Sequence, residues 1–311
     1  VTSYLVDLNL LPNTQYYYRV RALNSNLCES PNSNVIPVLT KNDAVVWYNA
    51  KWSNVSGPTE NLNSIIRDAY KVGDPGRPSF ETKNLKVESN GLLTIGKDQH
   101  VTVHGLINTV DDKIVVEDDG MIHQISQGDN TGKITVKRNV TFTTARQQYN
   151  YMISPVKDQK MKYIFGADGS GVPYIQYVMR LNEPTNVFVN DGDGIYAQGK
   201  GYAVKEAKTA YVSNDGVAFF KGIPANGDFE YPLSNTPNRG YNLSGNPYPS
   251  HLDLKKLYDD SKNSEGGHYI SSTFRFWDNK SNDVIGQQGG SYQGYAYALF
   301  NASSGVGTKA P

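Results

Sequence analysis

Residues 191–194, Asp-Gly-Asp-Gly, combine two carboxylates with two glycines in a pattern that can wrap a hard cation. Asp191 and Asp193 would supply oxygen ligands for calcium, and the glycines would let the backbone turn around the ion. A complete calcium loop of the EF-hand type needs a further acidic ligand, where this chain has Tyr196 and Ala197. A hairpin turn selects the same residue types. The sequence therefore leaves two interpretations, a plain turn or a calcium site at Asp191 and Asp193.

Histidines and further acidic residues are weaker candidates for metal ligation. His100 and His104 are four residues apart, a spacing that brings two ligands together on a helix. The valines that alternate with them predict a strand, on which four residues span about 13 Å, so we do not expect these two histidines to share an ion. The acidic residues 111–112 and 117–119 fit a solvated edge that blocks strand pairing, with calcium as the alternative.

Tyrosine and tryptophan side chains are the candidates for binding a carbohydrate. The chain has 22 tyrosines, and an exposed aromatic ring offers an apolar face on which a sugar ring can stack. The candidate stacking residues are Trp52, Tyr70, Tyr174, Tyr177, Tyr292 and Tyr295. Carbohydrate binding requires at least two such rings to be exposed along one concave surface, with Asn or Asp beside them. Buried rings would argue against it.

Recognisable catalytic motifs do not occur in the sequence. The nucleophile elbow G-x-S-x-G, the metalloprotease pattern H-E-x-x-H, the P-loop and the dinucleotide fingerprint G-x-G-x-x-G are all missing. Cys28 is the single cysteine, so neither an intrachain disulfide nor a cysteine metal site can form. We therefore predict a non-catalytic protein without a cofactor, calcium excepted. The alternative is a polysaccharide lyase or hydrolase, since some polysaccharide lyases are solenoids, although about 100 residues make few coils.

Composition places these candidate residues on strands and turns. Lysine and arginine together number 30, as do aspartate and glutamate, so the chain lacks the positive field of a nucleic-acid binder. Its apolar runs are far shorter than the ~20 residues of a membrane-spanning helix, so we predict no membrane span. Tyrosine, threonine, asparagine and glycine are frequent, which is typical of strands and turns. The predicted fold class is all-β.

Residues 1–40 are predicted to be the C-terminal part of a β-sandwich. Residues 10–16 form a turn, and residues 16–22 then alternate in the manner of a strand. The L-x-P-x-T-x-Y pattern from Leu10 to Tyr16 resembles the tyrosine corner of fibronectin type III domains, and residues 35–40 would be the last strand. About three strands cannot bury both faces of a sandwich, so we expect either further residues upstream of Val1 or another segment covering these strands.

Residues 41–147 are predicted to form a short β-solenoid. Short apolar segments recur at close spacing between Gly, Asn and Asp turns, and residues 89–93 and 118–122 repeat one motif. The alternative is a sandwich with tight hairpins. A solenoid needs covered ends; we expect Trp47, Trp52 and the apolar pair at 65–66 to cover the first coil.

Residues 148–311 are predicted to form a β-sandwich or jelly-roll-like domain with one helix. About ten longer strands are separated by turn signals, and residues 229–233 and 240–244 are among them. Residues 252–261 have the helical pattern, with Ser250 or Asp253 as the N-cap. The intervening pairs Asn246-Pro247 and Tyr248-Pro249 predict a stiff corner between strand and helix, in which Asn246 and Asp253 bond the backbone.

The order of motifs resembles that of large surface proteins exported by the type IX secretion system of Gram-negative bacteria. The residues that carry this resemblance are 136–140, 149–156 (YNYMISPV), 198–204 (QGKGYAV), 219–227 (FFKGIPANG), 240–254, 276–278 and 292–300. The resemblance implies an extracellular or outer-membrane-surface protein, whose partner during export is the type IX machinery. It implies no reaction.

Two functions follow as expectations. The first is a structural or adhesive surface module built from tandem β-domains, which contacts an extracellular glycan or another surface protein. The second is a carbohydrate-binding module of a polysaccharide-acting surface protein, using Trp52, Tyr174, Tyr177, Tyr292 and Tyr295 for stacking.

Overall fold

The protein is almost entirely β, which confirms the predicted fold class. The computed structural model describes residues 10–25, 28–140, 149–165, 175–206, 217–237, 239–263, 265–277 and 297–308. The described part holds one α-helix, α1 (Leu254–Asp260), and the 3₁₀ turns η1 (Met161–Tyr163) and η2 (Glu183–Thr185). No helix within those ranges has the length and apolar character needed to cross a bilayer.

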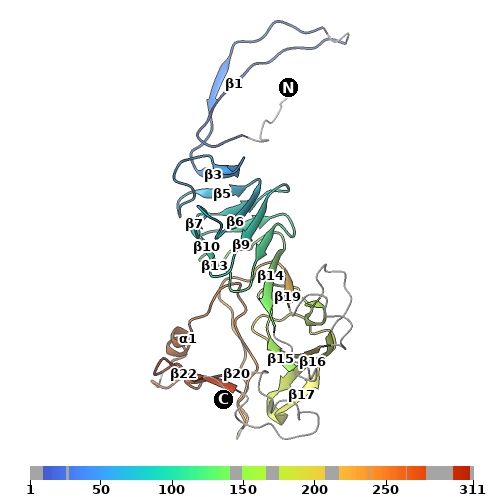
Figure 1. The fold of residues 1–311 in the computed structure, drawn as a ribbon, viewed down its shortest axis with the longest axis vertical. Helices are drawn as coiled ribbons and strands as arrows, with labels where there is room; N and C mark the ends of the chain where they lie inside the picture. The colour runs from blue at the N-terminus through green and yellow to red at the C-terminus, as the bar shows by residue number, and fades with distance from the viewer. Residues whose placement is uncertain are drawn as a thin grey trace.

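An antiparallel strand pair stands at the N-terminal end of the molecule (Figure 1). It consists of β1 (Gln15–Tyr18) and β2 (Ile36–Leu39), with Gln15 opposite Leu39. The Tyr16 hydroxyl accepts a hydrogen bond from the Leu11 amide at 2.8 Å, the contact that a tyrosine corner requires. Among the described residues of this region, β1 and β2 form a two-stranded sheet, and two strands do not make a sandwich. Membership of the fibronectin type III family therefore stays a prediction.

Residues 44–139 form a parallel β-solenoid, which confirms the solenoid prediction over the hairpin sandwich (Figure 1). Each coil contributes one strand to each of three sheets. The first sheet stacks β3 (Ala44–Tyr48), β5 (Asn63–Ile66), β8 (Leu85–Val87) and β11 (Ile107–Thr109). The second stacks β6 (Ala69–Val72), β9 (Leu92–Ile95), β12 (Ile114–Val116) and β14 (Ile134–Asn139), and the third β7 (Phe80–Thr82), β10 (His100–Val103) and β13 (Met121–Gln124).

The solenoid core consists of side-chain columns that run from coil to coil. Strand alternation points every second residue inward, and parallel register places equivalent residues above one another. The resulting columns are Tyr70–Leu93–Ile114, Val72–Ile95–Val116–Val136 and Phe80–Val101–Ile122, with every member buried. Contacts between neighbouring coils span 21 residues from Ser79 to His100 and 23 from Glu81 to His104. This spacing of about 21–23 residues is the repeat of the solenoid.

Glycine at the corners lets successive coils approach closely. A Cβ atom on Gly91, which precedes β9, would lie 2.2 Å from the Ile66 carbonyl oxygen of the coil below. Backbone at that distance cannot move aside without disturbing the ladder. The repeated motif of residues 89–93 and 118–122 is thus a corner motif, although Gly91 leads into the second sheet and Gly120 into the third.

Aromatic side chains cover the first coil, as predicted for Trp47 and Trp52. β3 folds back on β4 (Lys51–Trp52), which places the two tryptophans opposite each other. Trp47 packs edge-on against Tyr70, with ring centroids 4.7 Å apart, and Trp52 packs against Phe80 at 6.0 Å. The Arg77 guanidinium lies 5.0 Å from the Trp47 ring centroid, within the range of a cation–π contact.

The C-terminal region covers the other end of the solenoid. β19 (Val217–Gly222) pairs antiparallel with β14, so the last parallel strand gains a partner from the following region. The carbonyl of Pro249, in the predicted corner, accepts a hydrogen bond from the Ile122 amide of β13 at 2.7 Å. The Asn226 side-chain amide donates to the carbonyls of Ser126 and Gly128.

Two antiparallel sheets occupy the region predicted as a sandwich (Figure 1). One has the order β15 (Tyr149–Met152), β18 (Tyr202–Glu206), β16 (Ile175–Asn182) and β17 (Val187–Asn190). The other joins β20 (Thr273–Trp277), β21 (Tyr297–Asn301) and β22 (Val306–Thr308). The Trp277 indole connects the two sheets, because it donates to the Tyr149 carbonyl at 2.7 Å and stacks on Tyr151.

Two predicted strands of this region are wrong. Residues 229–233 and 240–244 are irregular, apart from an isolated bridge at Ser244. A side chain connects the two segments in place of a strand ladder. The Asn242 side-chain amide accepts a hydrogen bond from the Ser234 N–H and donates one to the Ser234 carbonyl. An asparagine that bonds the backbone in this way replaces ladder hydrogen bonds, and alternation alone does not reveal it.

The corner and the helix form as predicted. The Asn246 side chain accepts from the Tyr248 amide at 3.0 Å and donates to the Ser250 carbonyl. The Asp253 carboxylate caps α1, accepting from the Lys256 amide at 3.0 Å. Asp253, rather than Ser250, is therefore the N-cap.

We expect Gly91→Ala to destabilise the solenoid by about 1–3 kcal/mol, the usual range for overpacking, because its methyl group would overlap the Ile66 carbonyl. Urea denaturation followed by circular dichroism measures this free energy of unfolding. Gly307→Ala is the matched control, since its nearest neighbour lies 3.6 Å from the added Cβ. Equal stability of the two variants would contradict the close stacking described for the corners.

Candidate functional site

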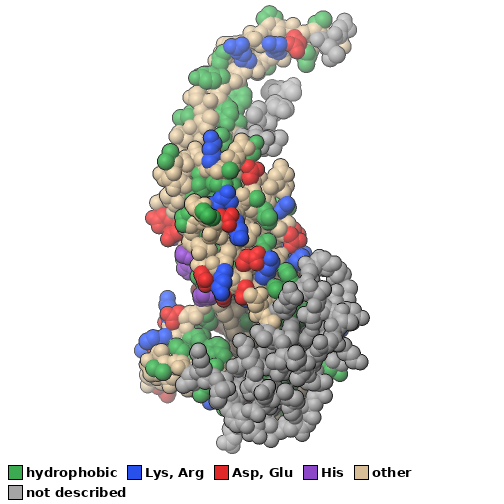
Figure 2. All heavy atoms as spheres, viewed as in Figure 1, with side chains coloured by type: hydrophobic (Ala, Val, Ile, Leu, Met, Phe, Trp, Pro, Cys, Tyr) green, Lys and Arg blue, Asp and Glu red, His purple; other side chains and the backbone are tan. Residues whose placement is uncertain are grey.

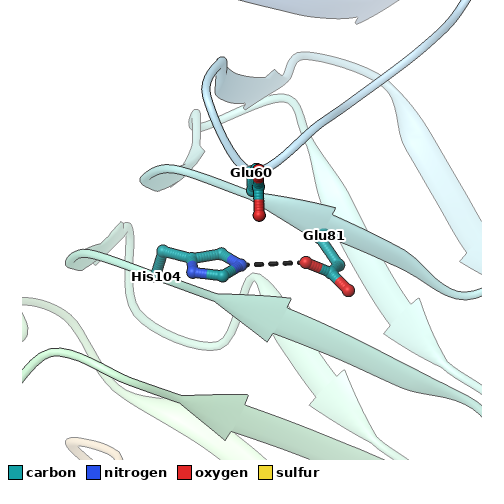
Figure 3. A group of neighbouring side chains, drawn as sticks. All are labelled: Glu60, Glu81 and His104. Atoms are coloured by element: carbon teal, nitrogen blue, oxygen red, sulfur yellow. Dashed lines mark hydrogen bonds and ion pairs between the residues drawn. The ribbon is translucent and has the colours of Figure 1, made fainter.

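The outer face of the third sheet carries a group of histidine and glutamate side chains. Glu81 lies on β7, His104 directly follows β10, and Glu60 lies on the turn before β5. One ligand atom from each of the three lies within 4.8 Å of the others. Figure 3 shows the Glu60 carboxylate directed toward the other two side chains. We call Glu60, Glu81 and His104 the coil cluster.

The contacts within the coil cluster are polar and open to solvent. The His104 Nε2 atom lies 2.9 Å from the Glu81 carboxylate (Figure 3). The His104 side chain is 34% exposed and that of Glu81 54%. Glu60 is also exposed. Figure 2 shows histidine and acidic side chains along one edge of the solenoid. The cluster therefore offers one imidazole nitrogen and two carboxylates to a ligand arriving from solution.

A hollow of about 340 Å³ lies in the C-terminal region. Tyr231 and Tyr241 contribute rings to it, Arg180 and Lys200 contribute positive charges, and Asn182 and Asn242 contribute amides, among its lining residues. The Tyr241 side chain is 53% exposed. The Arg275 guanidinium lies 5.2 Å from the centroid of its ring. We call this the tyrosine hollow.

The carboxylates of Glu183 and Asp191 bind residues that line or adjoin the tyrosine hollow. Burial alone would raise the pKa of Glu183, but hydrogen bonds from Thr236 and from the Gly240 amide lower it below its ordinary value. The Thr236 amide and hydroxyl donate at 2.9 and 2.8 Å, and the Gly240 amide at 2.6 Å. Glu183 thus ties residues 236–240 to the turn between β16 and β17. Asp191 pairs with Arg180 at 3.4 Å and with Lys200 at 2.5 Å.

The predicted calcium residues lie among basic side chains. Asp191 pairs with Arg180 and Lys200, as described above. Asp193 lies 3.4 Å from the Lys160 ammonium and 3.5 Å from that of Lys162. Burial alone would lower the pKa of Lys200, and its hydrogen bond with Asp191 raises it. Positive charge therefore already balances both carboxylates, as the interpretation of a plain turn expects, and calcium binding at these residues stays a prediction.

Among the predicted stacking residues that the structure describes, Trp52 and Tyr70 lie together, but their rings pack on each other instead of lining an open concave surface. Trp52 packs against Trp47, Tyr70 and Phe80 in the aromatic cover of the solenoid, and Tyr70 is buried. Tyr177 is 40% exposed on β16. Tyr174, Tyr292 and Tyr295 lie outside the described residues. The rings that line a hollow, Tyr231 and Tyr241, were not among the residues predicted from the sequence.

The coil cluster was also missed, although the sequence contains a signal for it. His104 was assessed with His100, its neighbour along the strand, and those two residues were not expected to share an ion. The partners of His104 lie on other coils instead. Glu81 lies one coil away, 23 residues before His104, and Glu60 lies two coils away, 21 residues before Glu81. In a solenoid, residues separated by one repeat become neighbours. A search at the repeat length of about 21–23 residues would have identified all three.

The comparisons with known proteins give a family and no function. A family model described as Domain of unknown function (DUF8693) matches residues 40–309. None of the curated proteins and none of the solved structures matches the chain. The matched residues run from β3 to β22, so they include the solenoid and the C-terminal sheets and leave out β1 and β2. Because the match covers most of the chain, the protein belongs to the family Domain of unknown function (DUF8693).

Proposed function

We propose that the chain is a non-catalytic structural and adhesion module of an extracellular or outer-membrane-surface protein, exported by the type IX secretion system. The observation that carries the proposal is the stack of parallel coils, which is covered at both ends. Such a stack separates the segments attached to its two ends by a fixed distance. Its partners are the type IX machinery during export and an extracellular glycan or surface protein afterwards.

The geometry supports a spacer. Coil-to-coil hydrogen bonds and buried side-chain columns run through the solenoid, and close packing of this kind resists bending. In Figure 1 the strand pair β1–β2 and the C-terminal sheets lie at opposite ends of the solenoid. Tyr17 and Leu39 of that strand pair are 71% and 61% exposed, so they offer apolar surface to a partner at the distal end. The resemblance to type IX cargo, which spans roughly residues 45–311, supports the export route.

Export can be tested in the bacterium that produces the full-length protein. We expect antibodies against residues 40–309 to label intact wild-type cells or to detect the protein in the medium. Inactivating the type IX outer-membrane pore should abolish both signals and leave the protein in the periplasm. A periplasmic marker controls for lysis. Unchanged surface labelling in the pore mutant would refute the export route.

The tyrosine hollow favours carbohydrate binding as a second function. Tyr231 and Tyr241 offer rings for stacking, and Asn182 and Asn242 provide side-chain amides beside them. Arg180 and Lys200 also line the hollow; both pair with Asp191, and their remaining N–H groups can donate hydrogen bonds to sugar hydroxyls. The hollow meets part of the arrangement that sequence analysis required, with other residues: Tyr241 is exposed, whereas Tyr231 is half-buried.

We expect the purified protein to bind polysaccharides on a glycan array, and Tyr241→Ala to weaken that binding roughly tenfold, which corresponds to about 1.4 kcal/mol. Isothermal titration calorimetry with the best array ligand measures the change. Tyr269→Ala is the matched control, because Tyr269 is 75% exposed and does not line the hollow. An array without hits, or equal losses in both variants, would exclude the hollow as a glycan site.

Glu183 gives the wall of the hollow a defined pH dependence. Its pKa is lowered in the folded protein, so its stabilising contribution is complete above the unfolded value of 4.5 and disappears as the pH falls through the lowered value. We expect Glu183→Gln to lower the melting temperature at pH 7, and the difference from wild type to shrink below pH 4.5. Glu230→Gln changes an exposed glutamate outside these hydrogen bonds and should have no effect. A difference that is constant with pH would contradict the ionised state of Glu183.

A further inference from the structure

The coil cluster takes one side chain from each of three successive levels of the solenoid. Glu60 precedes the first complete coil, Glu81 belongs to that coil, and His104 to the next. Backbone pairing fixes their relative heights, since Val101 of β10 pairs with Phe80 of β7. The arrangement therefore follows from the fold, and the three side chains need only rotate to approach one another.

The charges of the coil cluster are unbalanced among its own members. Two carboxylates with ligand atoms within 4.8 Å repel each other, by about 1 kcal/mol at 4 Å in water. The His104 ring, 2.9 Å from Glu81, can offset one negative charge when protonated. A divalent cation bound by all three groups would offset both charges and would use the neutral imidazole as a ligand.

The donor set selects a class of metal. One imidazole nitrogen with two carboxylates suits zinc and neighbouring transition metals, whereas calcium prefers oxygen ligands alone and needs six to eight of them. Ligand bonds of about 2.0–2.2 Å place donors of a tetrahedral site roughly 3.3 Å apart. His104 and Glu81 are already that close. Glu60 and Glu81 are exposed, so their side chains are free of core packing and can close the remaining gap.

We propose that Glu60, Glu81 and His104 form a binding site for a divalent transition metal such as zinc. The three protein ligands leave the remaining coordination positions to water. The bound ion connects the turn before β5 with β7 and the end of β10. It therefore fastens the first coils of the solenoid to each other on their outer face.

Binding to the folded chain stabilises it in proportion to the logarithm of metal concentration above the dissociation constant. The ligands are adjacent in the folded solenoid and 21–23 residues apart along an unfolded chain, so the native state binds the ion more tightly. Zinc should accordingly raise the melting temperature. Substitutions on the outer face leave the buried columns intact, so the variants below should fold.

The test is a titration of the purified chain, without a polyhistidine tag, with zinc chloride in an isothermal titration calorimeter. We expect a single zinc ion to bind, and Glu81→Gln and His104→Ala each to weaken binding roughly tenfold or more. His100→Ala is the matched control, because His100 is an exposed histidine at the start of β10, outside the coil cluster, and its loss should leave zinc binding unchanged. Melting temperatures of the same four proteins with and without zinc provide the second readout.

Three results of this titration would overturn the proposal. Wild-type protein that binds no zinc up to millimolar concentration would do so directly. Wild-type affinity in both Glu81→Gln and His104→Ala would place zinc elsewhere on the chain. Displacement of zinc by excess calcium would show an all-oxygen site instead. None of these results bears on export or on the tyrosine hollow, so the metal site and the proposed functions can fail separately.

Discussion

Parallel strands stacked in coils leave a row of unpaired backbone groups at each end of the stack, and the rest of this structure depends on how those two rows are covered. At the first end, β4 turns back on β3 and the ring cluster around Trp47 covers the inner columns. At the last end, β19 pairs antiparallel with β14, and the corner at Pro249 extends β13. Exposed edges of parallel ladders recruit other chains, so both covers protect solubility as well as stability. The family match at residues 40–309 includes both covers.

The same stacking converts distance along the chain into adjacency in space. Glu60, Glu81 and His104 meet because the repeat brings them to one face, and no local motif marks them. In the C-terminal region the opposite holds: the tyrosine hollow depends on single contacts between irregular segments, such as Glu183 with Thr236 and Gly240. A site on the solenoid is thus positioned by the repeated register of its parallel strands. The hollow is positioned by individual hydrogen bonds, so its shape responds more readily to one substitution.

Sequence reasoning predicted the parts of this fold that are determined locally. The short strands between turns predicted the solenoid, and the Asn-Pro and Tyr-Pro pairs with Asp253 predicted the corner and the helix cap. Residues 240–244 show where such reasoning fails, because the Asn242 side chain satisfies backbone groups that alternation assigns to a ladder. Trp52 shows a second kind of failure: an aromatic residue in a short strand reads equally as a ligand platform or as a cover for a core. The coil cluster required knowledge of the repeat length, which comes from strand register and not from any single segment.

The closing of the last coil by the C-terminal region has a consequence for the order of folding. Contacts within the solenoid join residues about 21–23 apart, so each coil can add to the previous one soon after it is made. The contacts that cover the last coil span far more of the chain: 94 residues from Asn130 to Pro224, and 100 from Ser126 to Asn226. For a chain that folds during synthesis at about 5–20 residues per second, the last coil waits roughly 5–20 s for its cover. During that interval the growing edge of the solenoid is the part of the molecule most exposed to pairing with another chain.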